Sequence, residues 1–88
     1  MEKQVAIIVF EIENRQEYHD IEVKLDITAN ELVHSLNVAY QLGINEEDIT
    51  QVYLKAENPI ALLKGNKTLE EFGVHNATKI IYSGELSR

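Results

Sequence analysis

The side chains that could carry chemistry in this chain are histidines, carboxylates and hydroxyls, because the chain contains no cysteine. The three histidines are His19, His34 and His75. No two of them stand at the i, i+4 spacing with which a helix offers two metal ligands. Isolated histidines of this kind are typical of solvated or capping positions. The histidine pattern therefore predicts no metal site.

The acidic residues form two short runs. Glu46, Glu47 and Asp48 lack the alternating carboxylates and the glycine of a calcium-binding loop, so we expect solvated acids in a loop or at a helix end. Glu70 and Glu71 favour the first turn of a short helix through its dipole.

The serines are the remaining candidates for a catalytic nucleophile. Ser35, Ser83 and Ser87 have no histidine and aspartate in the arrangement that activates a nucleophile. The sequence thus predicts no catalytic residue, no cofactor site and no metal site. We expect a protein that is not an enzyme.

Chain length and net charge limit the classes of protein to which this sequence could belong. Eighty-eight residues favour a single domain, with a core over residues 4–83 and a short tail over residues 84–88. The net charge of −7 and the scattered lysines and arginines argue against nucleic acid as a partner. No apolar run has membrane-spanning length, and no signal peptide is evident. We expect a cytoplasmic protein that is not inserted in a membrane.

Apolar periodicity predicts the elements. Alternation and β-branched residues indicate strands over residues 5–13, 18–26, 51–57, 60–63 and 79–82. Thr28 and Glu31 have the spacing of a capping box, and an apolar face follows, so the main helix is predicted over residues 28–42. That face comprises Leu32, Val33, Leu36, Ala39 and Tyr40. Gly43 stands where a left-handed C-cap is expected.

The end of the chain adds a short helical turn and a last strand. Thr68 is placed to cap a turn through Glu71, while Leu69, Phe72 and Val74 provide apolar anchors to the core. One main helix against a mixed sheet of four to five strands is an α+β architecture in two layers.

The first strand can be oriented in two ways. We expect Ala6, Ile8, Phe10 and Ile12 to point into the core, because Glu11 and Glu13 share the opposite parity. Val5, Ile7 and Val9 would then form an unusually apolar outer surface. The alternative is that Ile7 and Val9 belong to the core.

The segment "GNKTLEEFGVHNATKIIYS" and the element order resemble the ubiquitin-like β-grasp superfamily over nearly the whole chain. Ubiquitin and the small sulfur carriers end in a diglycine, whereas this sequence ends "YSGELSR". We therefore expect no conjugation. Modifier or sulfur carrier is the first alternative function, and a self-associating β-grasp domain of an unrelated pathway is the second.

Within that superfamily the sequence resembles the YukD/EsaB family, whose members accompany the type VII (WXG-protein) secretion systems of Gram-positive bacteria. The resemblance lies in the run from Gly73 to Ile80 and in "IEVKLDITANELVHSLNVAYQLGI". It implies a non-enzymatic accessory or regulatory protein that binds secretion-system components, either cytoplasmic or membrane-anchored. A monomer or a weak homodimer is expected.

The β-grasp resemblance also suggests a binding surface. Its first and last strands are central neighbours, which would bring Ile7 and Val9 near Ile81 and Tyr53, with Lys55 at the rim. By the same resemblance Ile80 and Tyr82 face the core while Ile81 faces outward. We expect these five outward residues to form an apolar, protein-binding patch.

Overall fold

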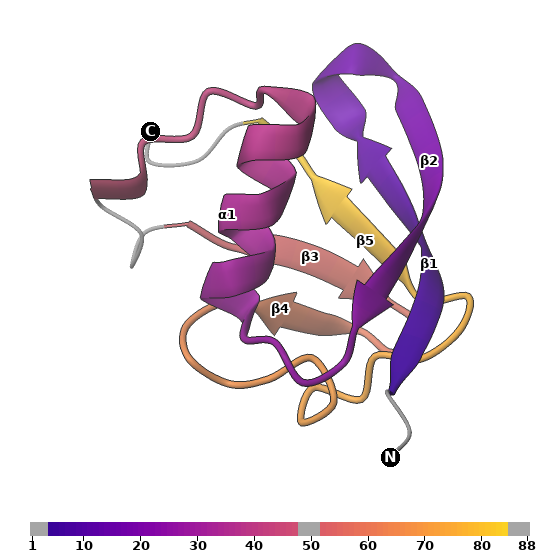
Figure 1. Cartoon of the computed structure of the whole chain (residues 1–88). Helices are drawn as coiled ribbons and strands as arrows, with labels where there is room; N and C mark the ends of the chain where they lie inside the picture. The colour runs from indigo at the N-terminus through magenta and orange to yellow at the C-terminus, as the bar shows by residue number, and fades with distance from the viewer. Residues whose placement is uncertain (1–3, 48–51, 85–88) are drawn as a thin grey trace.

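The chain folds into two layers, with helix α1 (Ala29–Tyr40) lying across one face of a five-stranded mixed sheet (Figure 1). The structure is a computed structural model that describes residues 4–47 and 52–84. Its strands are β1 (Val5–Ile12), β2 (Glu17–Lys24), β3 (Leu54–Glu57), β4 (Ala61–Leu63) and β5 (Lys79–Tyr82). A short 3-10 turn, η1 (Glu13–Arg15), joins β1 to β2. The predicted α+β architecture is confirmed.

The strand order across the sheet is β2-β1-β5-β3-β4. Strands β1 and β5 are parallel, and the other neighbouring pairs are antiparallel. The first and last strands are therefore central neighbours, as expected. Strand β3 is shorter than the predicted 51–57, since Tyr53 precedes it, and Gln51 lies outside the described residues. Strand β5 has the predicted bounds.

Helix α1 begins with the predicted capping box. The backbone N–H of Glu31 donates to Thr28 Oγ1 at 3.1 Å, and the Thr28 N–H donates to Glu31 Oε1 at 2.8 Å. The helix ends earlier than predicted, because its left-handed C-cap is Gln41 (φ 53°) rather than Gly43. Asn37 draws the following chain back, since its side chain bonds both the N–H and the C=O of Ile44.

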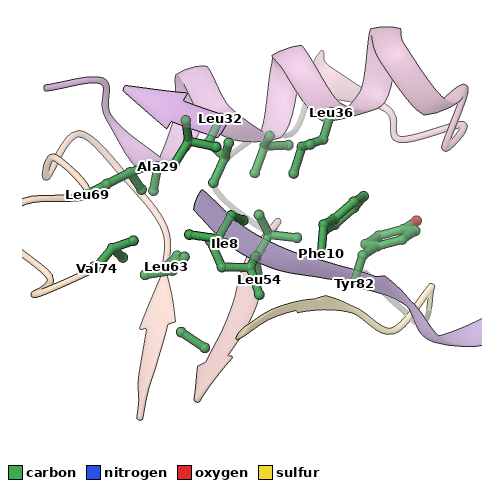
Figure 2. Close-up of a cluster of buried hydrophobic side chains, with 14 of the residues drawn as sticks. Ile8, Phe10, Ala29, Leu32, Leu36, Leu54, Leu63, Leu69, Val74 and Tyr82 are labelled. Atoms are coloured by element: carbon green, nitrogen blue, oxygen red, sulfur yellow. The ribbon is translucent and has the colours of Figure 1, made fainter. Parts of the chain in front are cut away.

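The core lies between α1 and the inner face of the sheet (Figure 2). Ile8 and Phe10 are fully buried beneath the helix, which settles the orientation of β1: its even positions point inward. The helix buries Leu32, Val33 and Leu36, as predicted. Ala39, which was predicted on the same face, is exposed because it lies toward the edge of the sheet beside β2.

The segment between β4 and β5 closes one end of the core. Leu69 and Val74 are buried, and Phe72 packs against the core cluster. Thr68 and Glu71 exchange capping bonds like those of α1, and the N–H of Phe72 donates to the Thr68 carbonyl at 3.1 Å. The expected short helical turn is a single hydrogen-bonded turn. Within the described residues, no helix is long and apolar enough to cross a bilayer.

Candidate functional site

The face of the sheet opposite α1 carries all five residues of the predicted patch. Strand pairing and alternation define this outer face, which is not covered by the helix (Figure 1). Its members are Tyr18, Asp20, Glu22 and Lys24 from β2; Val5, Ile7, Val9 and Glu11 from β1; Lys79 and Ile81 from β5; Tyr53, Lys55 and Glu57 from the β3 segment; and Leu62 from β4.

Exposed apolar side chains lie toward both sides of this outer face. Ile7 is 48% exposed and Val5 39% on β1, whereas Leu62 is 55% exposed on β4 and Tyr53 36% beside β3. Val9 is half-buried, and Lys55 is exposed. Because soluble proteins rarely leave several large apolar side chains on one uncovered face without a reason, the outer face is the candidate functional site.

Ile81 departs from the expectation. It lies on the outer face, yet it is only 7% exposed. Strand β5 is central, and Ile81 stands in register between Glu11 of β1 and Lys55 of β3. Neighbours on both sides leave little of its side chain open. The exposed apolar residues therefore form two groups instead of the single continuous patch that we expected.

An ion pair lies on the outer face between these groups. Lys79 Nζ is 3.2 Å from Glu11 Oε1, and it also stands 5.8 Å from the centre of the Tyr18 ring. The hydrogen bond to Glu11 and the attraction of that carboxylate raise the pKa of Lys79 above its ordinary value. Lys79 is thus charged at neutral pH, and it separates the apolar residues of β1 from those of β3 and β4.

Ile7 is held in place by a device that sequence reasoning missed. Its N–H donates to Asn76 Oδ1 at 2.8 Å, and its carbonyl accepts from the N–H of Ala77 at 2.9 Å. The turn before β5 thereby continues the hydrogen bonding along β1 past the first residue of β5. The available signal was the position of Asn76 inside the run from Gly73 to Ile80, which had been considered only as a pattern of resemblance.

The histidines and acids form surface contacts. His34 Nδ1 is 2.6 Å from Glu46 Oε1, while Asn37 Nδ2 donates to Glu46 Oε2 at 2.7 Å. Both hydrogen bonds lower the pKa of Glu46, and the bond from Asn37 contributes most. Asp48 lies outside the described residues. In residues 4–47 and 52–84, no group of three or more histidines and carboxylates is placed to hold a metal ion.

The remaining histidines also have local partners. His19 stacks on Tyr40 with ring centres 4.8 Å apart, and its Nε2 is 3.3 Å from Glu17 Oε1. His75 Nδ1 lies 2.8 Å from the carbonyl oxygen of Asn76. Both contacts lie at the surface, and within the described residues neither ring is hydrogen-bonded to a serine.

No family model matches the chain, and no curated protein matches it by sequence. Solved structures do match it. The C-terminal ubiquitin-like domain of mouse tubulin-specific chaperone e is similar with a TM-score of 0.73 at 14% identity, over 100% of this chain and 96% of that chain. The chain has a ubiquitin-like β-grasp fold.

Two further structures share the ubiquitin-like fold. The ubiquitin-like domain of tubulin-binding cofactor B has a TM-score of 0.71 at 14% identity, over 91% of this chain and 89% of that one. A protein designed on the basis of ubiquitin has a TM-score of 0.65 at 19% identity, over 94% and 89%. At such low identities the likeness concerns the fold, and the outer face must be interpreted from its own residues.

Proposed function

We propose that this ubiquitin-like protein is a non-enzymatic interaction module that binds another protein through its outer face. The exposed apolar side chains on an uncovered sheet carry the proposal, with Ile7 as the most exposed of those on β1. Charged residues surround them, including Glu22 opposite Ile7 and the Lys79–Glu11 pair. Small surfaces of mixed character suit weak and reversible complexes.

The finer proposal is an accessory or regulatory role in a type VII secretion system, exercised in the cytoplasm. It is supported by the resemblance of residues 73–80 and 21–44 to the YukD/EsaB family. The partner would then be a cytoplasmic or membrane-anchored component of the machinery, such as its ATPase. Neither nucleic acid nor a lipid bilayer is proposed as a partner, since the chain carries a net charge of −7.

The interaction is tested with the purified cytoplasmic domain of the secretion ATPase encoded in the same genome. Ile7→Lys places a cation opposite Glu22, which preserves the strand pair while removing the apolar surface. Val38→Lys is the matched control, because Val38 is 64% exposed on α1 and lies outside the outer face. We expect Ile7→Lys to weaken binding at least about tenfold and Val38→Lys to leave it unchanged.

The secretion role and the general protein-binding role can be disproved separately. A genome without a type VII ATPase, or an ATPase domain that does not bind the wild-type protein, overturns the secretion role. The general proposal is overturned if wild-type protein and Ile7→Lys, both shown to be folded by circular dichroism, recover the same partners from cell extract in equal amounts.

A further inference from the structure

A second surface, distinct from the outer face, lies between strand β2 and helix α1. A groove of about 430 Å³ runs there, with Ile21 and Ile27 on one side and Leu36, Ala39 and Tyr40 on the other. Ile21, Ile27 and Tyr40 are half-buried, so apolar surface remains open along the groove. Tyr40 packs on Phe10 and on His19, which fixes that end of the groove.

Strand β2 borders the groove with an open edge. It is the outermost strand on its side of the sheet, and within the described chain it pairs only with β1 (Figure 1). Every second residue of such a strand directs its N–H and C=O away from the sheet. Alternate residues of the eight-residue strand β2 thus offer hydrogen bonds to another extended segment directly beside an apolar groove.

A second copy of this chain is a poor occupant of that edge. Two β2 strands related by a two-fold axis place residues of the same face opposite one another. The two registers with the longest overlap set Asp20 against Asp20, or Asp20 against Glu22, of the second copy. Like charges directly opposite destabilise a strand pair, so the acids of β2 oppose self-pairing.

The same acids favour a partner of opposite charge. An added strand places every second side chain over the groove, opposite Ile21 and Val23, and the intervening side chains opposite Asp20 and Glu22. We propose that the β2 edge binds an extended segment of a partner protein in which apolar residues alternate with lysine or arginine. Backbone hydrogen bonds would hold the segment, and the groove and the two acids would select it.

The test uses a short capped peptide that alternates valine and lysine, added to the isotope-labelled full chain and followed by NMR. We expect the largest shifts at β2 and at the groove residues of α1, with slower hydrogen exchange at β2 amides. The same peptide with N-methyl groups on every second backbone nitrogen, which removes the donors facing β2, should bind at least about tenfold more weakly.

Variants separate strand addition from general attraction to an acidic protein. The double change Asp20→Lys, Glu22→Lys should weaken binding about tenfold. The control Glu13→Lys, Glu47→Lys makes the same change in net charge at exposed positions outside the groove, and should have a much smaller effect. Ala39→Arg, at an exposed position on α1, should block the groove while the protein stays folded.

Three results would each overturn the proposal. Equal loss of affinity in both double variants would mean non-specific charge attraction, and undiminished binding of the N-methylated peptide would exclude strand addition. Sedimentation of the wild-type protein as a dimer, with exchange protection confined to β2, would make a second copy the occupant.

Discussion

Thr78 is the buried polar side chain of the described residues, with 0% exposure. Its hydroxyl donates to the carbonyl oxygen of Asn58 at 2.7 Å and accepts from the N–H of His75 at 3.0 Å. One oxygen thereby joins the turn after β3 to the turn before β5. Buried polar groups that lose a partner cost more than the bond itself contributes, so this hydroxyl has a structural role that can be measured.

Thr78→Val keeps the shape of the side chain and removes the hydroxyl. We expect it to lower the free energy of unfolding by about 1–3 kcal/mol, because the Asn58 carbonyl and the His75 N–H lose their partner. Thr78→Ser keeps the hydroxyl and should lose less. Urea unfolding monitored by circular dichroism measures both variants. Equal stability of the wild type and the valine variant would contradict this role.

For single residues, the alternation along the sequence predicted which face of the sheet each side chain occupies. Ile7, Tyr53 and Lys55 lie on the outer face as expected. The exposure of Ile81 could not be predicted in the same way, because it depends on Glu11 and Lys55, which stand far apart in sequence and meet it only in the assembled sheet. The facing of a side chain is a local property, whereas its exposed area depends on neighbours across strands.

Among the elements, helix α1 shows most clearly what local sequence determines. Its start is set by Thr28 and Glu31, three residues apart, and was predicted from their spacing. At its end, beside the left-handed Gln41, the guanidinium of Arg15 donates to the carbonyls of Tyr40 and Gln41 at 2.9 and 2.8 Å. These partners lie 25 and 26 positions from Arg15, beyond the reach of a capping rule.

Arg15 is expected to stabilise the helix terminus as a paired donor to two carbonyls and as a cation at the negative end of the helix dipole. Arg15→Ala should lower the free energy of unfolding by about 1 kcal/mol. Arg15→Lys keeps the charge but loses the planar pair of donors, so an intermediate loss is expected. Urea unfolding at low and high salt measures both variants. If lysine fully replaces arginine, charge alone explains the effect.

The whole molecule is an acidic domain whose sheet ends in one long open strand, β2, and one short strand, β4. Two of its carboxylates, Asp20 and Glu22, lie on the open edge strand, where a second copy would pair edge to edge. The central position of the first and last strands was predictable from a resemblance over nearly the whole chain. The groove beside β2 was not, because it arises from how far α1 stands from the sheet edge.

Changing one of these acids should therefore alter assembly. Asp20→Lys turns the contact between residues 20 and 22 of two copies from repulsion to attraction, and we expect dimers to form as concentration rises. Asp20→Lys, Glu22→Lys restores like charges at that contact and should return the protein to a monomer. Sedimentation over a range of concentrations measures both. A monomeric single variant would show that charge is not what keeps the edges apart.

The contact of Asn76 with β1 fills a position that β5 is too short to reach. Strand β1 has eight residues and β5 has four, so half of β1 has no strand beside it on that side. The side-chain oxygen of Asn76 accepts the hydrogen bond from the Ile7 N–H, as a backbone carbonyl of a neighbouring strand would. The Asn76 side chain and the Ala77 backbone thus occupy hydrogen-bonding groups of Ile7 in the middle of the sheet. We therefore expect them to hinder the pairing of a strand from another molecule at this position.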